Sequence, residues 1–394
     1  MDPRRNPYAP GAGTPPPDLA GRDGIIERAA IALDRIRAGR AARSFIYYGL
    51  RGVGKTVLLN KIRLDAEARG IATVAMEAPE GRTLPGVLAP ALRAALLRLS
   101  RGEAAKAGLA RAMRALAGFV NAFKLKYDDV EVGFDFETEK GLADSGDLDM
   151  DLADLLAAIG EAAAERKTAF VMFIDELQYV PEEQLAALIS ALHQVSQRQK
   201  PVTMVAAGLP QLLGQMGRAK SYAERLFEFI ETTQLEEAAA REALINPAKE
   251  EGAQYKGEAV GEILKQTQCY PYFLQEWGKH SWDIAEKSPI TLDDVKHATI
   301  AALAEMDASF FRVRFDRLTP SEKRYLRAMA ELGPGPHRSG DIADILGKKV
   351  NEVAPTRSRL IHKGMIYSPS HGDNAFTVPL FDGFMKRVMP ALEL

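Results

Sequence analysis

Cysteine, long apolar runs and a strong charge imbalance are all lacking in this 394-residue sequence, and each absence excludes a class of protein. The single cysteine, Cys269, has no partner for an internal disulfide, and no cluster of Cys and His has the spacing of a zinc site. No run of about 18 apolar residues is present, so no helix is expected to cross a membrane. The N-terminal segment is rich in Pro and Gly and has no apolar stretch, which argues against a secretory signal. We therefore expect a soluble, cytoplasmic protein.

The charge is nearly balanced overall but is distributed unevenly along the chain. The formal net charge is −2, yet residues 310–394 carry 14 Lys and Arg against 9 Asp and Glu, so the rest of the chain is acidic. A modestly basic C-terminal unit suggests an anionic partner at that end. At about 100–200 residues per domain, the length predicts two or three domains, and no repeat of 20–50 residues is evident.

Hydrophobic patterning predicts an α/β domain followed by two smaller units. Residues 1–20 hold six prolines and are expected to form an extended arm. A helix, a buried strand, a second helix and a second strand follow, which is typical of a parallel sheet with helices on both faces. Further strands are expected at 169–174, 202–207 and 227–235. The boundaries that we predict are 1–20 for the arm, 21–235 for the α/β domain, 236–315 for a helical unit and 316–394 for a C-terminal unit.

An insertion of more than 90 residues separates the second and third strands, far more than one crossover helix needs. Its first part is predicted to form helices over 84–99 and 104–119, and its second part, 122–138, alternates like a β-hairpin. Residues 128–151 hold ten acidic residues and one lysine. Two interpretations stay open for the 122–151 segment: a solvated hairpin and loop, or an acidic protrusion that binds a protein partner or a second copy of the chain.

The strongest chemical signal is GLRGVGKT at 49–56, which satisfies G-x-x-x-x-G-K-[ST] between a predicted strand and a predicted helix. Glycines let backbone N–H groups close around phosphate oxygens at the positive end of the helix. Lys55 is expected to neutralise the β- and γ-phosphates of ATP or ADP, and the Thr56 hydroxyl to ligate Mg²⁺. The predicted phosphate-binding residues are Gly49, Leu50, Arg51, Gly52, Val53, Gly54, Lys55, Thr56 and Val57. The same lysine and threonine exclude a dinucleotide-binding oxidoreductase, for which no ribose-binding acid is placed.

The second signal is AFVMFIDELQ, an apolar strand that delivers two carboxylates at its C-terminal end. Open α/β sheets place their ligands at that end of the strands. We expect Asp175 to act at the Mg²⁺ ion and Glu176 to orient and deprotonate an attacking water. The next strand, 202–207, ends in Ala-Ala-Gly-Leu-Pro and offers no polar residue to sense the γ-phosphate, unless Gln211 takes that part. Slow hydrolysis, or use of the nucleotide as a switch, is therefore expected.

The C-terminal unit has the pattern of a winged helix-turn-helix. Helices are predicted at 321–332, 339–346 and 351–363, followed by strands at 364–368 and 375–378. The third helix of such a unit enters the major groove of DNA, and Ser339 is a further candidate for a phosphate contact. The predicted DNA contacts are Lys348, Lys349, Thr356, Arg357, Arg359 and Lys363. Because winged helices also dock proteins, duplex DNA and a protein partner both stay open for this unit.

With these motifs and a predicted helical lid in place, the chain resembles the AAA+/STAND-type P-loop ATPases, close to the "archaeal ATPase" group. Its domain order is similar to that of the origin-recognition initiator ATPases. LAGRD at 19–23 resembles the box that precedes the first helix in these proteins, which implies that Arg22 lies near the adenine. Two further residues are candidates from their own positions in the sequence. Pro271, in CYPYFLQ, falls where a lid helix could bring backbone onto the nucleotide base, and Arg225, in SYAERLF, is either an arginine finger or an ordinary surface arginine on a helix.

Departures from these families limit the comparison. CYPYFLQ lacks the lid arginine of the initiators and the Gly-x-Pro of the STAND switches, and the chain has no repeat array. Two functions follow as hypotheses: a nucleotide-controlled switch that binds DNA through the winged helix, or a nucleotide-gated signalling or scaffold ATPase whose winged helix and acidic hairpin dock proteins.

Overall fold

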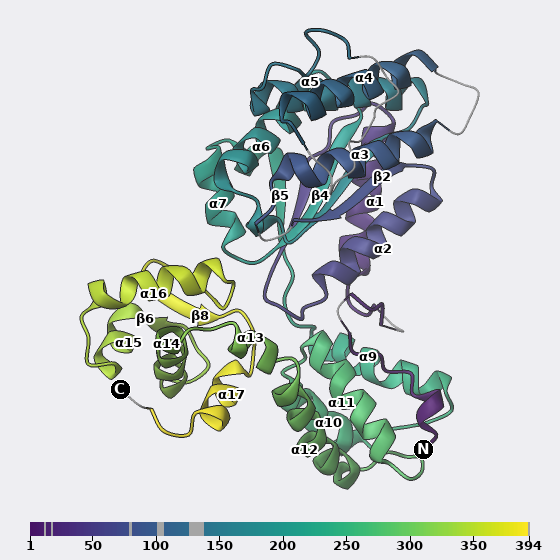
Figure 1. The fold of residues 1–394 in the computed structure, drawn as a ribbon. Coiled ribbons are helices and arrows are strands. Elements are labelled where there is room, and N and C mark those ends of the chain that lie inside the picture. The colour runs from purple at the N-terminus through teal and green to yellow at the C-terminus, as the bar shows by residue number, and fades with distance from the viewer. Residues whose placement is uncertain (12, 17–18, 79–80, 101–105, 126–137, 393–394) are drawn as a thin grey trace.

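A five-stranded parallel sheet forms the core of the N-terminal domain (Figure 1). The computed structural model describes the whole chain except residues 12, 17–18, 79–80, 101–105, 126–137 and 393–394. The strand order is β2-β3-β4-β1-β5, with Ile46 of β1 opposite Ala206 of β4 and Phe229 of β5. The strands are β1 (Ser44–Tyr48), β2 (Ala72–Glu77), β3 (Phe170–Asp175), β4 (Val202–Gly208) and β5 (Phe227–Glu231). The prediction of a parallel α/β sheet is confirmed.

Helices cover both faces of this sheet because side chains alternate along each strand. Phe45 and Tyr47 of β1 pack into the core on one face, whereas Ile46 between them packs into the core on the other. The first face is covered by α1 (Asp23–Arg37) and α2 (Lys55–Ala68). The second is covered by α3 (Leu84–Leu99), α4 (Lys106–Ala122), α5 (Leu148–Glu165), α6 (Glu182–Gln197) and α7 (Leu212–Ala219). Two short elements, η2 (Leu177–Tyr179) and α8 (Ala223–Leu226), complete the domain.

The inserted segment adds helices to the second face rather than standing apart from it. Its helices α3 and α4 lie where they were predicted, and α5 extends their layer (Figure 1). The last acidic residues of the insertion stabilise the start of α5. Asp147 caps the helix by accepting the N–H of Met150, and buried Asp151 accepts the N–H groups of Ser145 and Gly146. Acidic residues in a first turn also suit the helix dipole. The predicted hairpin at 122–138 falls largely outside the described residues.

A four-helix unit follows the sheet domain: α9 (Glu237–Glu250), α10 (Gly257–Thr267), α11 (Pro271–Ile284) and α12 (Leu292–Ala308). The N-terminal arm runs along this unit and contains one short helix, η1 (Pro3–Arg5). Tyr8 is 4% exposed in the core of the unit, and the Asn6 amide donates to the Lys279 carbonyl at 3.0 Å and the Asp283 carboxylate at 2.8 Å. The arm is therefore part of the helical unit, which its proline content alone did not indicate.

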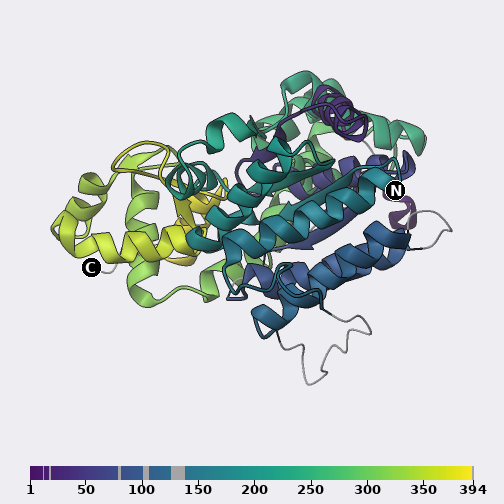
Figure 2. The same ribbon diagram turned by 90° about the horizontal axis from the view of Figure 1, so that it is seen from above.

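The C-terminal unit combines helices with a small antiparallel sheet of order β6-β8-β7. Its elements are α13 (Arg312–Asp316), α14 (Pro320–Glu331), β6 (His337–Arg338), α15 (Ser339–Ile345), α16 (Val350–His362), β7 (Ile366–Tyr367), β8 (Asp373–Phe376) and α17 (Phe381–Val388). Phe311 contacts Phe381 and Phe384 across the junction, so one apolar core runs from the four-helix unit into this one. The chain termini lie on opposite sides of the molecule (Figures 1 and 2). Within the described residues, every helix is too short or too polar to cross a bilayer.

Candidate nucleotide site

The loop between β1 and α2 has the close backbone packing that its glycines predict. A Cβ on Gly49 would lie 2.0 Å from the Thr232 carbonyl oxygen, so no other residue fits there. Gly54 has a φ of 88° at the start of α2, in the left-handed region that glycine adopts without strain. The first N–H groups of α2 therefore face the loop, as an anion site requires.

Lys55 lies folded into the loop with little exposure to solvent. It is 7% exposed, and its Nζ donates to the carbonyls of Gly49 at 2.9 Å and Leu50 at 2.8 Å. Burial lowers the pKa of Lys55 to about 8, against the opposing pull of Glu176 and Asp175. A buried ammonium held only by carbonyls gains strongly from a phosphate group beside it.

Thr56 and Asp175 meet at the C-terminal edge of the sheet. The Thr56 hydroxyl donates to Oδ2 of Asp175 at 2.5 Å, and the backbone N–H of Glu176 donates to Oδ1 at 2.8 Å. Burial raises the pKa of Asp175, and these two hydrogen bonds oppose the rise. A hydroxyl and a carboxylate at this distance fit the ligand set that P-loop ATPases present to Mg²⁺.

The carboxylate of Glu176 is held by two side chains. Arg51 lies 3.4 Å from Oε1, and the Gln178 amide donates to Oε2. The other end of the Gln178 amide accepts the N–H of Leu209 at 3.0 Å, so this glutamine joins Glu176 to the end of β4. Glu176 itself has a φ of 52°, a strained conformation for a glutamate that is typical of functional sites.

Gln178 thus contacts the end of β4, the place where a polar side chain that senses the γ-phosphate was expected. The predicted substitute, Gln211, begins α7 outside the lining of the cavity described below, and its Oε1 is buried without a hydrogen-bond partner among the described residues. Gln178 stands in the FIDELQ motif. Its contact with Leu209 joins the ends of the neighbouring strands β3 and β4, which are far apart in sequence, so local sequence pattern could not predict it.

A cavity of about 660 Å³ opens beside this edge of the sheet. Its walls come from the arm, the phosphate loop, the Asp175–Glu176 pair, α11 and α13. The predicted residues that line it are Arg22, Arg51, Gly52, Val53, Gly54, Lys55, Thr56, Val57, Asp175, Glu176 and Pro271. Gly49 and Leu50 do not line it, but their carbonyls accept hydrogen bonds from Lys55. The cavity is large enough for a nucleotide, because small-ligand pockets span about 300–1,000 Å³.

Arg22 and Pro271 line the cavity together with the carboxylates. The Arg22 guanidinium donates to the carbonyls of Thr233 at 2.5 Å and Val53 at 3.4 Å, which fixes the start of α1 against the loop. Pro271 begins α11, and the next residue, Tyr272, donates its N–H to the Gly52 carbonyl at 3.2 Å. Six residues of the arm, 9–11, 13, 14 and 16, also supply part of the wall.

Arg314 is a cavity residue that sequence reasoning missed. It lies on α13, between the four-helix unit and the C-terminal unit, with its guanidinium 4.0 Å from the centre of the Phe310 ring. Burial, and secondly the charge of Arg51, lower its pKa to about 10. Two arginines thus line the cavity close to one another.

Comparisons with known proteins agree with this geometry. Residues 18–205 match the family model described as the AAA ATPase domain. The matched residues include the phosphate loop and the Asp175–Glu176 pair, so this part of the chain is similar to an AAA ATPase domain. Residues 308–385 match a second model, described as a domain of unknown function (DUF8462). A search of curated proteins found no match.

Solved structures align with nearly the whole chain, and one with a TM-score above 0.5 is similar in fold. A Walker-type ATPase of Pyrococcus abyssi is 15% identical with a TM-score of 0.61, and the match covers 95% of this chain and 97% of that one. The Orc1 protein of Aeropyrum pernix in complex with DNA is 16% identical with a TM-score of 0.45, covering 94% of both chains. Cdc6p from Pyrobaculum aerophilum is 14% identical with a TM-score of 0.47, covering 99% of this chain and 98% of that one.

The remaining predicted residues lie away from the cavity. Arg225 is exposed on α8 and does not line the cavity, so within one copy of the chain it has no access to the phosphates. Lys348 and Lys349 are exposed before α16. These three side chains are available to a partner.

The other predicted DNA contacts have partners within the C-terminal unit. Arg357 donates to Oδ1 of Asn374 at 2.6 Å and to the Ser368 hydroxyl at 2.9 Å. A second group centres on buried Glu322: Lys363 donates to its Oε2 at 2.8 Å and Arg359 lies 3.5 Å from its Oε1. Thr356 accepts from Arg359 at 3.1 Å. These contacts join α16 to the small sheet and to α14, a function that the sequence alone could not separate from DNA binding.

Proposed function

We propose that the protein binds ATP and Mg²⁺ in the 660 Å³ cavity, hydrolyses ATP slowly, and uses the nucleotide state to control a C-terminal winged helix that binds duplex DNA. The observation that carries the proposal is the position of Arg51. This residue of the phosphate loop contacts Glu176 through its side chain and the C-terminal unit through its backbone.

Each residue of the cavity has a part in nucleotide chemistry. Lys55 leaves its carbonyl partners to bind the β- and γ-phosphates, with the N–H groups at the start of α2. Thr56 and Asp175 would hold Mg²⁺, which neutralises phosphate charge when bound. Glu176 orients a water and accepts its proton as that water attacks the γ-phosphorus, with ADP and phosphate as products. Arg22 and Pro271 line the part of the cavity that would hold the base.

Arg51 and Arg314 provide the coupling to the C-terminal unit. The Arg51 N–H donates to the Thr377 carbonyl at 2.9 Å, and its guanidinium donates to the Tyr179 hydroxyl at 2.8 Å. Arg314 lies beside it on the connecting helix α13. A γ-phosphate draws both guanidinium groups toward it, and ADP draws them less, so the two nucleotides favour different positions of the C-terminal unit.

The same contact limits access to α16. Lys363, which follows this helix, lines a second cavity of about 300 Å³ together with Arg51, Glu176 and Arg314. In this arrangement the C-terminal end of α16 faces the ATPase domain, whereas Lys348 and Lys349 at its other end face solvent. We infer that DNA contact begins at these two lysines and that undocking of the unit extends it along α16.

Fluorescence anisotropy with duplex DNA across a salt series tests this contact. The double variant Lys348→Ala/Lys349→Ala is expected to bind DNA more weakly at every salt concentration. The negative slope of log K, the association constant, against log salt is expected to become shallower by about 2, because each lysine lost removes one phosphate contact. Lys287→Ala/Lys296→Ala removes the same charge from exposed positions of the four-helix unit and is expected to leave both values unchanged. Equal effects of the two variants would contradict the proposed DNA face.

A protein partner is the second candidate for the C-terminal unit. The observation that favours it is the internal engagement of Arg357, Arg359 and Lys363, which leaves few basic groups for a phosphate backbone. Absence of salt-dependent DNA binding in every nucleotide state would select this function. In that case exposed Arg225 and the acidic 122–151 segment are candidates for contacts with another copy of the chain or with another protein.

A further inference from the structure

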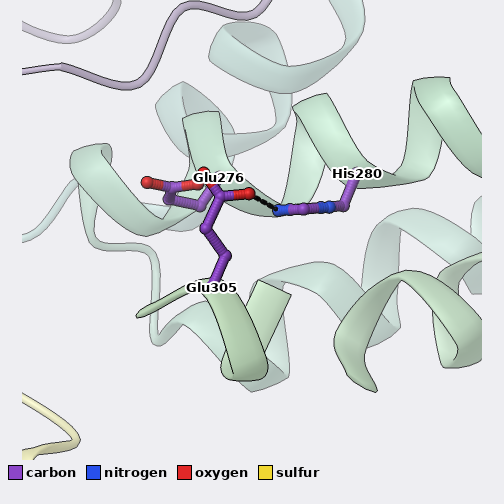
Figure 3. A group of neighbouring side chains, drawn as sticks. All are labelled: Glu276, His280 and Glu305. Atoms are coloured by element: carbon purple, nitrogen blue, oxygen red, sulfur yellow. Dashed lines mark ion pairs between the residues drawn. The ribbon is translucent and has the colours of Figure 1, made fainter. Parts of the chain in front are cut away.

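A compact group of metal-ligating side chains lies on α11 and α12, outside the nucleotide cavity. Glu276 and His280 are four residues apart on α11 and therefore face the same way. Glu305 comes from α12, which packs against α11. One ligand atom from each side chain lies within 4.8 Å of the other two, and Figure 3 shows Glu305 pointing toward His280 with Glu276 beside it.

Glu276 has an oxygen without a hydrogen-bond partner among the described residues, and His280 has a nitrogen that the structure pairs with Glu305 alone. Glu276 is 5% exposed; its Oε1 accepts the Tyr272 hydroxyl at 2.7 Å, but Oε2 is buried without a hydrogen-bond partner among the described residues. Nε2 of His280 is likewise buried and lies 3.0 Å from Oε2 of Glu305 without the alignment of a hydrogen bond. An unpaired carboxylate oxygen in a buried position is costly unless a cation reaches it.

We propose that Glu276, His280 and Glu305 bind a divalent transition-metal ion such as Zn²⁺. Imidazole suits Zn²⁺ and its neighbours in the first transition row and disfavours Mg²⁺ and Ca²⁺, which prefer oxygen ligands. One nitrogen and two carboxylate ligands leave a fourth tetrahedral position for water. In a tetrahedral site with bonds of about 2.0–2.1 Å the ligand atoms are about 3.4 Å apart, so small side-chain rotations suffice.

Lys279 is the competing cation at this site. Its Nζ lies 3.1 Å from Oε1 of Glu305, and both side chains are partly exposed. A flexible lysine can turn to solvent when a divalent ion takes the carboxylate. The ion would then join α11 to α12 through Glu276. Among the described residues, no hydrogen bond from a lysine reaches Glu276, so no lysine competes with the ion there.

The site is linked to the wall of the nucleotide cavity by one side chain. Tyr272, which donates its hydroxyl to Glu276, lines the cavity and stacks on Phe310 with ring centres 4.6 Å apart. Its Cβ also lies 3.2 Å from the position of a Cβ on Gly52. Metal binding would therefore hold this wall in place, although the binding itself does not depend on the proposed nucleotide function.

Isothermal titration of the full-length, chelator-treated protein with Zn²⁺ tests the proposal, with excess Mg²⁺ present to occupy Thr56 and Asp175. We expect one equivalent of Zn²⁺ with a Kd of about 10 µM or tighter. His280→Gln and Glu305→Gln are each expected to weaken binding at least about tenfold. His297→Gln, at an exposed histidine of α12, is the matched control and is expected to bind as the unaltered protein does.

Replacement of Zn²⁺ by Co²⁺ adds a spectroscopic reading of the same site. Visible absorption of four-coordinate Co²⁺ is expected in the unaltered protein and in His297→Gln, and it is expected to be lost in His280→Gln. Glu305→Gln alters a partly exposed side chain and keeps the test valid if His280→Gln does not fold. Binding weaker than the stated Kd, or binding that both site variants retain at full affinity, would overturn the proposal.

Discussion

Glu176→Gln is expected to lower the rate of ATP hydrolysis by about 100- to 10,000-fold while ATP still binds, because positioned general bases contribute about that much. Glutamine matches glutamate in size and keeps an oxygen toward Arg51, which lies 3.4 Å from Oε1. It cannot accept the proton of the attacking water. Phosphate release under saturating ATP measures the rate, and a fluorescent ATP analogue measures binding.

Glu183→Gln provides the matched control for that change. Glu183 is exposed in the first turn of α6, eight positions along the chain from Asp175 and outside the cavity lining. Its variant is expected to hydrolyse ATP at the unaltered rate. If Glu176→Gln kept full hydrolysis, another group would be the base, and the part assigned to Glu176 would be wrong.

Lys55→Ala is expected to weaken ATP binding by about 100-fold or more, since charge-assisted hydrogen bonds contribute about 1.5–3 kcal/mol each. The same change is not expected to destabilise the empty protein. Burial lowers the pKa of Lys55 from 10.5 to about 8, so between these values the unfolded chain binds more protons than the folded one and stability rises with pH. At neutral pH the buried charge therefore opposes folding, and its removal relieves that cost.

Titration with a fluorescent nucleotide and thermal unfolding without nucleotide measure the two parts of this prediction. Lys61→Ala is the control on the same helix: its side chain is half exposed and pairs only with Asp65 at 2.8 Å. Surface pairs of this kind contribute about 0.5 kcal/mol or less, so neither measurement is expected to change. Loss of stability in Lys55→Ala, with affinity unchanged, would mean that the loop lysine is structural.

The parts of the fold that could be predicted from the sequence are those encoded locally. The strand before Gly49, the helix after Lys55 and the apolar strand that ends at Asp175 each carry a pattern within about ten residues. The sheet follows from them because parallel strands bring their carboxyl ends to one edge. The phosphate loop and the two carboxylates were therefore placed correctly without the structure.

Long-range contacts account for what could not be predicted. The arm packs on helices more than 230 residues away in sequence, as when Tyr8 donates to the Leu244 carbonyl. Arg314 reaches the cavity only because α12 and α13 fold back over the loop. The sequence predicted helix α16. It did not indicate which basic residues on or beside this helix contact Glu322 and Asn374 and which face solvent. Such pairings depend on tertiary packing, which no local pattern encodes.

The central claim is that nucleotide state moves the C-terminal unit, and the distance between spin labels on the two parts tests it most directly. Labels at Glu183→Cys on α6 and Asp344→Cys on α15 occupy exposed positions, and Cys269→Ser removes the native thiol. With Glu176→Gln blocking hydrolysis, ATP and Mg²⁺ are expected to shift the distance distribution away from that measured with ADP or without nucleotide. Superimposable distributions at saturating ATP, at saturating ADP and without nucleotide would contradict the claim.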